Sequence, residues 1–237
     1  MIRLLTIAAL AASMLPSMAA AQSSDELRAR ARRESSEFFG FELKVGTYRP
    51  EARAVGGGSA WQEFFGGDRG PLLQLEFDVF AYRIPYVGLI GGGVSAGWAR
   101  YERGLCDPNT GCGGGGRLDE DGNARLYPVA GLAVLRVDTL SRYLGIPFVF
   151  TGKIGADIFF YRITGGGSAS GRSVGLRWAL QFALELDFIN RTRARSLDDE
   201  WGINHTTLFF EIFGSTADSE IDLGQNLAWT AGLGMTF

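Results

Sequence analysis

The sequence predicts an all-β fold, an eight-stranded antiparallel β-barrel that crosses a membrane. Eight segments have strand character, and most of them alternate apolar residues with polar or small ones, which is the periodicity of a strand with two different faces. Each segment has about ten residues or more, enough to cross a bilayer at a tilt. No stretch after the N-terminus holds the ~18 consecutive apolar residues of a membrane helix. Because every backbone donor must be paired in lipid, such strands must close into a barrel without edges.

The N-terminal segment has the pattern of a secretory signal peptide. Arg3 supplies a positive charge, residues 4–15 form a short apolar run, and a group of small residues ends at Ala21. We expect cleavage after Ala21, with an uncleaved anchor helix as the alternative. Residues 22–36 are expected to form a linker or a short helix, and residues 37–237 the barrel.

Four strands are expected in the first half of the mature chain. Their ranges are 37–48, 72–83, 86–102 and 125–138. The first two alternate cleanly, whereas the third is rich in glycine and its register stays open. The fourth is apolar on both faces, and its Pro128 fits a central ladder position poorly, which suggests a neighbouring bulge.

Four more strands follow in the second half. Their ranges are 147–163, 173–186, 205–214 and 227–237. The sixth strand alternates most regularly. Leu176 and Trp178 fall on one of its faces, and Arg177 and Glu185 on the other. This pattern predicts one face toward lipid and one toward a polar interior.

The last strand stops on an aromatic residue. Its apolar face carries Trp229, Leu233, Met235 and Phe237, and its other face holds small and polar residues. This pattern resembles the closing strand of bacterial outer-membrane β-barrels, in which an alternating strand ending in Phe is the assembly signal. The resemblance implies a location in the outer membrane. It also implies, as partners, the barrel-assembly machinery, outer-membrane lipid and lipopolysaccharide.

An even number of strands places both ends of such a barrel in the periplasm. External connections are then expected at 50–70, 103–124, 164–172 and 215–223, and periplasmic ones at 84–85, 139–146 and 189–204. We expect residues 190–200 to form a short periplasmic helix between strands 6 and 7. Leu197 and Trp201 would dock this helix on the barrel rim. Residues 22–36 would also lie in the periplasm.

Several short motifs are spread over most of the mature chain. They are the segments 40–46, 48–50, 127–128, 145–147, 152–155, 202–206 and 209–211. Together these motifs resemble a family of small outer-membrane β-barrel proteins known from myxobacteria and their relatives. That family is defined by location and fold and carries no established activity. The resemblance therefore implies a barrel and no particular mechanism.

Charged residues fall on the polar faces of the predicted strands. The set expected to line the lumen is Glu42, Lys44, Glu76, Asp78, Lys153, Asp157, Arg177, Glu185, His205 and Glu211, which Arg100 and Arg136 could join. One interpretation is a charged water path. The other is a ladder of ion pairs that fills the lumen. The ladder is favoured because an eight-stranded barrel is about wide enough for its own side chains, and buried charges need partners.

The single histidine, His205, shares a face with Thr207 and Glu211. A histidine near a hydroxyl and a carboxylate raises the idea of a lipid hydrolase. However, Thr207 and Glu211 would lie roughly 13 Å apart along one strand, so another strand would have to supply a missing group. We therefore expect a structural histidine at the lumen rim and no catalytic residue.

Two cysteines, Cys106 and Cys112, flank a turn-forming stretch in a predicted external loop. In an exported protein this spacing favours a local disulfide. A metal site is disfavoured because no second cysteine pair or histidine lies near. The acidic run 119–123 lacks the distal glutamate of a calcium loop. We expect no metal and no cofactor.

The composition narrows the function classes. The formal net charge of −3 implies no general affinity for nucleic acid. No glycine run precedes a helix in a βαβ unit, which disfavours a phosphate-binding loop. The leading hypothesis is an outer-membrane barrel with a largely filled lumen and a structural or surface-interaction role through its external loops. The alternatives are a narrow channel for small or apolar solutes and a lipid-modifying hydrolase.

Overall fold

The computed structural model describes residues 37–51, 69–106, 117–164, 168–189, 197, 200–218 and 222–237, with only the backbone described for the strand residues between 102 and 122. The expected signal peptide and linker, residues 1–36, lie outside the described residues. Among the described residues, no helix is long and apolar enough to span a membrane.

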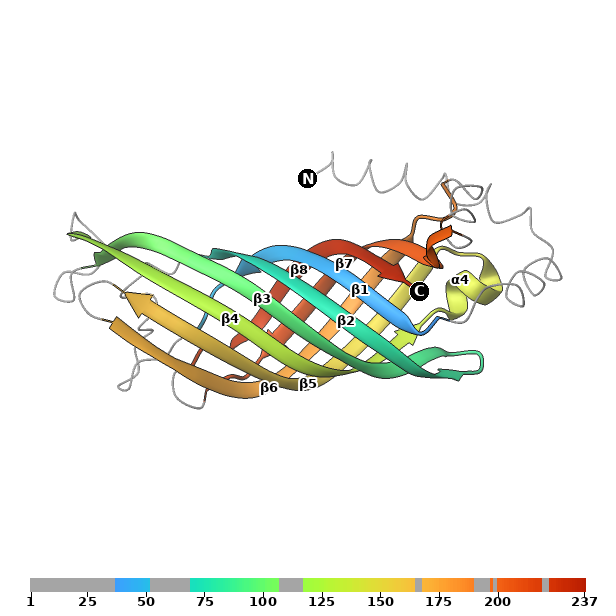
Figure 1. Ribbon diagram of the computed structural model, residues 1–237, viewed down its shortest axis with the longest axis horizontal. Helices are drawn as coiled ribbons and strands as arrows, with labels where there is room; N and C mark the ends of the chain where they lie inside the picture. The colour runs from blue at the N-terminus through green and yellow to red at the C-terminus, as the bar shows by residue number, and fades with distance from the viewer. Residues whose placement is uncertain are drawn as a thin grey trace, which may run out of the picture.

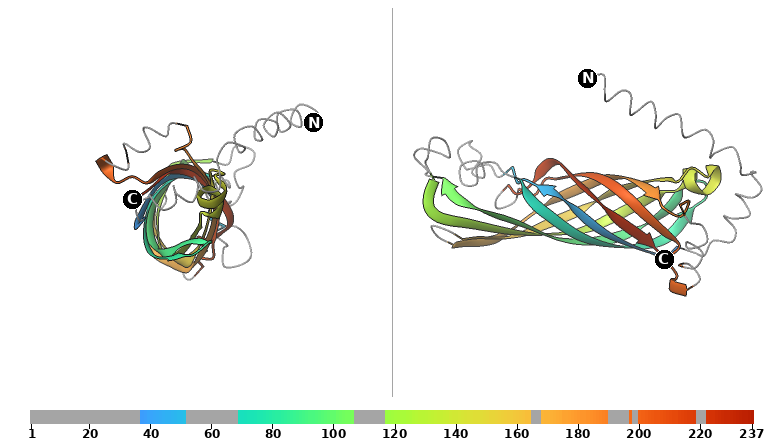
Figure 2. Two further views of the ribbon diagram at one scale, coloured as in Figure 1. Left: turned by 90° about the vertical axis from the view of Figure 1, so that its right-hand side faces the viewer. Right: turned by 90° about the horizontal axis from the view of Figure 1, so that it is seen from above.

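Eight antiparallel strands close into a barrel, in which each strand pairs with its neighbours in the chain and β8 pairs with β1 (Figure 1). The strands are β1 Phe39–Tyr48, β2 Gly70–Ile84, β3 Gly88–Cys106, β4 Arg117–Val137, β5 Phe148–Thr164, β6 Ser168–Glu185, β7 His205–Ser215 and β8 Gln225–Thr236. Seen end-on, they form a ring (Figure 2). The predicted eight-stranded barrel is confirmed.

The two ends of the barrel chain are tied together at one mouth. The N–H of Phe38 donates to the carbonyl of Phe237 at 2.6 Å, and the N–H of Phe237 donates to the carbonyl of Phe39 at 2.9 Å. The C-terminus therefore lies at the mouth where α4 also lies (Figure 1). Bacterial barrels keep their termini in the periplasm, so this mouth is periplasmic. The longest connection, residues 49–69, leaves from the opposite, external mouth.

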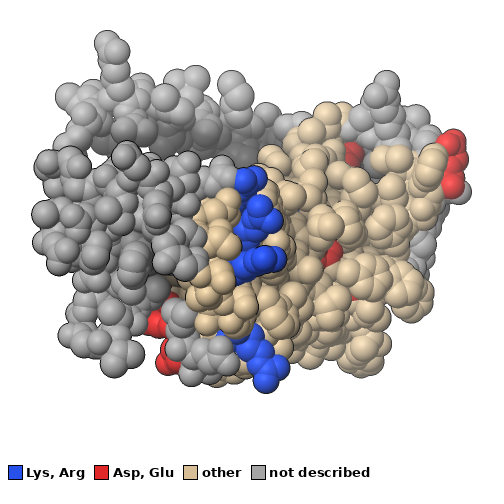
Figure 3. All heavy atoms as spheres, turned by 60° about the vertical axis from the view of Figure 1, so that its left-hand side comes forward, with Lys and Arg blue, Asp and Glu red and all other residues tan. Residues whose placement is uncertain are grey.

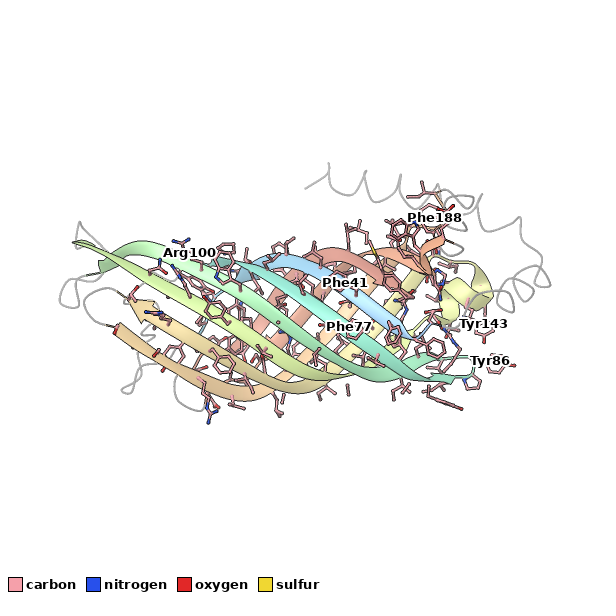
Figure 4. The ribbon with its side chains drawn as sticks, viewed as in Figure 1. Phe41, Phe77, Tyr86, Arg100, Tyr143 and Phe188 are labelled. Atoms are coloured by element: carbon pink, nitrogen blue, oxygen red, sulfur yellow. The ribbon has the colours of Figure 1, made fainter. Side chains whose placement is uncertain are left out.

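The outer face of the barrel is apolar. Phe41 and Phe77 are paired across β1 and β2 and point outward (Figure 4), and Leu180 and Leu208 are 57 % and 50 % exposed. The surface seen in Figure 3 carries few charged side chains over much of its area. A continuous apolar surface of this kind marks a lipid contact, because water-soluble proteins rarely expose one. The chain is a transmembrane β-barrel.

Pro128 sits in β4 without the bulge expected beside it. The β3–β4 ladder keeps one register on both sides of it, with Ala96 opposite Val129 and Ala99 opposite Leu126. The ladder is interrupted between these pairs, where proline has no N–H to donate. Gly97 makes room, since a Cβ there would lie 3.0 Å from Cγ of Pro128. β4 thus accommodates Pro128 by losing hydrogen bonds to β3 at this point, while the register of the two strands stays the same.

A helix that we did not expect lies between β4 and β5. Helix α4, Thr139–Leu144, connects β4 to β5 at the periplasmic mouth (Figure 2), where we expected only a turn. It ends at Gly145, whose φ of 68° is a left-handed conformation that glycine adopts without steric cost. Most of residues 190–200 lie outside the described residues. The described residues of this segment, Leu197, Glu200 and Trp201, are helical, as expected. Trp201 is 72 % exposed, so its expected docking on the rim is wrong.

β3 and β4 reach further out than expected. The connection predicted at 103–124 is largely strand, with Glu102 opposite Asn123 and Arg103 opposite Gly122. Two strands of one hairpin pair with each other, so their ladder continues past the ends of shorter neighbours. The predicted disulfide joins Cys106 and Cys112. Cys112 and the side chain of Cys106 lie outside the described residues.

Candidate functional site

Two lysines and three glutamates meet in the middle of the lumen. Lys44 Nζ lies 2.8 Å from Glu76 Oε2 and 2.7 Å from Glu211 Oε2. Lys153 Nζ lies 2.7 Å from Glu42 Oε2 and also contacts Glu76 Oε1. Because β1 and β5 stand on opposite sides of an eight-stranded ring, these contacts bridge the lumen. We call these five residues the central ion-pair cluster.

The central ion-pair cluster is shielded from water. The side chains of Lys44, Lys153, Glu76 and Glu211 have no exposed surface, and that of Glu42 is only 12 % exposed. Buried charges are stable only when paired and hydrogen-bonded, which this arrangement provides. The cluster therefore fills the section of the lumen that it crosses.

Neighbouring polar groups complete the central layer. Gln181 Nε2 donates to Glu42 Oε1 at 2.9 Å. Arg177 donates to Gln74 Oε1 at 3.1 Å and lies 3.8 Å from Glu211 Oε1. The Arg177 guanidinium also stacks over the Phe213 ring, 4.3 Å from its centroid. Arg177 thus joins the charged layer to the apolar one above it.

The predicted lumen residues do not all join one ladder. Asp78 and Asp157 face the interior and are buried, but among the described residues they form no salt bridge with the central ion-pair cluster. Glu185 and His205 lie at the periplasmic mouth. Arg100 faces outward near the external mouth (Figure 4), so it does not line the lumen. The central lysines and glutamates and the pair Glu185 and His205 lie at different heights along the barrel axis. Alternation predicts the face of a residue but not its height.

A second charged network closes the periplasmic mouth. Arg83 donates to Asp138 Oδ2 at 2.6 Å and to Glu37 Oε1 at 3.0 Å. Arg142 of α4 lies 3.7 Å from the same Glu37 oxygen. The contacts link the entry to β1, the end of β2 and the α4 connection. Sequence reasoning missed these residues because they lie at strand ends and beyond them, where alternation stops.

His205 and Glu185 belong to this periplasmic network. His205 Nδ1 lies 2.5 Å from Asp187 Oδ2. Glu185 Oε1 accepts from Ser141 Oγ at 3.2 Å and lies 3.6 Å from Arg136. Each charged group here faces a partner of opposite sign. The arrangement is that of a polar rim that holds the mouth together.

Two groups of residues could supply ligands to a metal ion. They are Glu185 with Asp187 and His205, and Glu42 with Glu76 and Asp78, whose ligand atoms lie within 4.8 Å of one another. Arg136 stands beside the first group and Lys153 beside the second. Since these cations already compensate the carboxylates, we assign no metal to either group.

The three residues that suggested a hydrolase, His205, Thr207 and Glu211, lie at different heights in the lumen. His205 pairs with Asp187, whereas Glu211 is held by Lys44 in the central ion-pair cluster. Thr207 faces the lumen between them and lies beside Gly234, where a Cβ would come within 2.7 Å of the threonine Oγ1. The structure does not bring these side chains together as a nucleophile, a base and an orienting acid.

An apolar layer of buried aromatic and aliphatic side chains lies in the external part of the lumen. The Tyr48 ring stacks on Phe159 and Phe213, with centroids 5.5 Å and 6.1 Å apart. Its hydroxyl donates to the Leu223 carbonyl at 2.6 Å, and the Tyr101 hydroxyl donates to the Tyr48 carbonyl at 2.8 Å. This apolar layer lies between the central ion-pair cluster and the external mouth. The sequence signal for it was present, because strand 4 is apolar on both faces.

Comparisons with known proteins find only distant similarity. No protein-family model and no curated protein matches the chain. Three solved structures are similar. Ail of Yersinia pestis, in complex with the heparin analogue sucrose octasulfate, is 14 % identical over 84 % of this chain and 99 % of its own, with a TM-score of 0.42. Neisserial surface protein A is 14 % identical over 84 % and 97 %, with a TM-score of 0.47.

The third is OprG of Pseudomonas aeruginosa, an outer-membrane protein, which is 13 % identical over 86 % of this chain and 97 % of its own, with a TM-score of 0.49. Similarity this distant leaves both the fold and the function to the chain's own geometry. The closed ring and the apolar outer face carry the assignment. The chain is a small eight-stranded β-barrel of the bacterial outer membrane.

Proposed function

We propose that this barrel has a structural or surface-interaction role through its external loops and that its lumen does not conduct. The observation that carries the proposal is the stack of the central ion-pair cluster beneath the apolar layer around Tyr48. An ion entering from outside would have to displace packed aromatic rings. It would then have to break salt bridges between Lys44, Lys153 and their glutamates, each break leaving a buried charge unpaired at about 3–5 kcal/mol.

The narrower expectations belong to the same proposal. We assign the chain to the myxobacterial type of small outer-membrane barrel on its motifs, such as residues 40–46. We also propose a cleaved signal peptide, contact with lipopolysaccharide, and recognition of the Phe237 strand by the barrel-assembly machinery. We also propose that the chain has no catalytic role.

Conductance in planar bilayers tests the filled lumen. The refolded barrel is expected to give no ion-conducting steps. A variant that hollows the apolar layer, Tyr48→Ala with Phe213→Ala, is expected to show more leakage than the wild type. The matched control is Phe41→Ala with Phe77→Ala, which removes two outward aromatic rings and leaves the lumen filled. Regular conductance steps from the wild-type barrel would establish the narrow channel instead.

A further inference from the structure

A row of arginines runs across the outer face of the barrel near its external mouth. Arg100 on β3 stands directly opposite Arg125 on β4, and Arg125 stands opposite Arg162 on β5. Arg172 on β6 lies diagonal to Arg162, since its direct partner is Phe160. Figure 3 shows Lys and Arg side chains gathered in a stripe at this level, and Figure 4 shows Arg100 on the outer surface. We call these four residues the arginine row.

The position of the arginine row is marked by the aromatic residues beside it. Trp98, Tyr127 and Phe160 are exposed on the same outward face. Each lies two residues from an arginine of the row, on its periplasmic side. Aromatic girdles mark the level at which a barrel leaves the hydrocarbon. The arginine row therefore lies at the level of the lipid headgroups in the external leaflet.

The arginine row places like charges next to one another. Residues directly opposite on antiparallel strands have Cβ atoms about 4.5–5.5 Å apart, and like charges there destabilise the sheet. Within the described part of the chain, Arg125 and Arg162 form no ion pair. At the periplasmic mouth, in contrast, Arg83 holds two carboxylates. An anion from outside the chain would remove the repulsion between Arg125 and Arg162.

The chemistry of that anion follows from the guanidinium group. Arginine presents a planar fork of donors that matches the oxygens of phosphate and binds them with two hydrogen bonds at once. A row that spans four strands suits several phosphates held close together on one molecule. Because the row lies beside the aromatic girdle and faces the lipid, a phosphorylated headgroup reaches it without leaving the membrane.

We propose that the arginine row binds the phosphate groups of lipopolysaccharide in the external leaflet, an inference that rests on the proposed lipopolysaccharide contact and supplies its site. The acyl chains of the same molecule would lie on the apolar face below, against Tyr127 and Phe160. The barrel would thereby hold the lipid from two sides, by charge above the girdle and by apolar contact beneath it.

The test compares two double variants in nanodiscs. Arg125→Gln with Arg162→Gln removes two charges from the row. Arg49→Gln with Arg69→Gln removes two charges from the same end of the barrel outside the row, on the residues that flank β1 and β2. The probes are lipid A with its phosphates, enzymatically dephosphorylated lipid A, inorganic phosphate and a soluble sulfated polysaccharide. Folding of each variant is checked by its heat-modifiable gel mobility.

The wild type is expected to prefer phosphorylated over dephosphorylated lipid A, and the row variant to lose about tenfold in affinity for the phosphorylated form. The control is expected to retain most of its affinity. Added salt should weaken wild-type binding more than binding by the row variant. Equal affinity of the row variant and the wild type would overturn the proposal.

Row-dependent binding of the sulfated polysaccharide or of inorganic phosphate in preference to lipid A would also overturn the proposal. The filled lumen is judged separately by conductance. A conducting barrel whose arginine row still selects phosphorylated lipid A would refute the proposed closed lumen alone. A closed barrel without that selectivity would refute the arginine row alone.

Discussion

Lys153 on β5 and Glu42 on β1 form an ion pair across the lumen, with 2.7 Å between Nζ and Oε2. Strands that share no backbone ladder are joined by this contact. The hydrogen bonds of the sheet hold each strand to its two neighbours, whereas the pair acts across the ring. The interior therefore contributes to the stability of the barrel as well as filling it.

Replacing Lys153 should destabilise the barrel strongly. Lys153→Met removes the cation that faces Glu42 and Glu76 and leaves their carboxylates buried, at a cost of about 3–5 kcal/mol. Reversible urea unfolding in detergent micelles, followed by tryptophan fluorescence, measures the change. Adding Glu42→Gln to Lys153→Met should recover part of the loss, because one buried charge disappears. A single variant within about 1 kcal/mol of the wild type would show that the pair does not stabilise the fold.

A close approach of backbones between β4 and β5 should make Gly155 intolerant of a side chain. A Cβ at Gly155 would collide with the Gly131 carbonyl oxygen and lie 2.9 Å from Cα of Leu132. Gly155→Ala is expected to cost about 1–3 kcal/mol in the same unfolding assay. Gly131→Ala is the matched control, since a Cβ there has no neighbour within 4 Å. Equal stability of the two variants would argue against the close packing of these strands.

Loss of Arg83 should loosen the periplasmic mouth and leave the rest of the barrel intact. Arg83→Gln breaks the contacts to Asp138 and Glu37 and is expected to cost about 1–2 kcal/mol. Hydrogen exchange by mass spectrometry should show faster exchange in residues 138–147. Arg162→Gln removes the same charge at the far mouth and should leave that segment protected. Unchanged exchange there in Arg83→Gln would show that the network does not hold α4.

The C-terminal aromatic residue should matter more for assembly in cells than for folding in detergent. Phe237 hydrogen-bonds to the start of β1 through its backbone N–H and carbonyl, and Phe237→Ala keeps both groups. The variant is expected to unfold like the wild type in urea but to reach the outer membrane in several-fold lower yield. Leu227→Ala, on the same face at the other end of β8, is the control. Equal membrane yields for the two variants would remove the assembly-signal role.

Periodicity explains why the fold could be predicted. In a strand, successive side chains point to opposite faces, so Trp178 and Arg177 are assigned to lipid and lumen as soon as the segment is recognised as a strand. Helix α4 was missed for the reverse reason. It is one short turn in a stretch without periodicity, and it ends where Gly145 adopts a left-handed conformation.

The candidate site was only partly predictable. Glu76 and Asp78 lie two residues apart on the same face of β2, yet Glu76 contacts both central lysines and Asp78 forms no ion pair among the described residues. Which carboxylate meets a lysine depends on the stagger between strands, which decides the height at which side chains from opposite walls meet. No local pattern carries that information.

By itself the sequence determined that the chain is a membrane barrel and which face of each strand meets lipid, since both follow from a period of two residues. Only the tertiary structure decided that the lumen divides into apolar, central and periplasmic layers. The same is true of the arginine row, because Arg100, Arg125 and Arg162 come together through pairing register alone. The pairing register and the closure of the ring bring together residues that are distant in the chain. The free energy of each depends on all eight strands, so no local pattern predicts it.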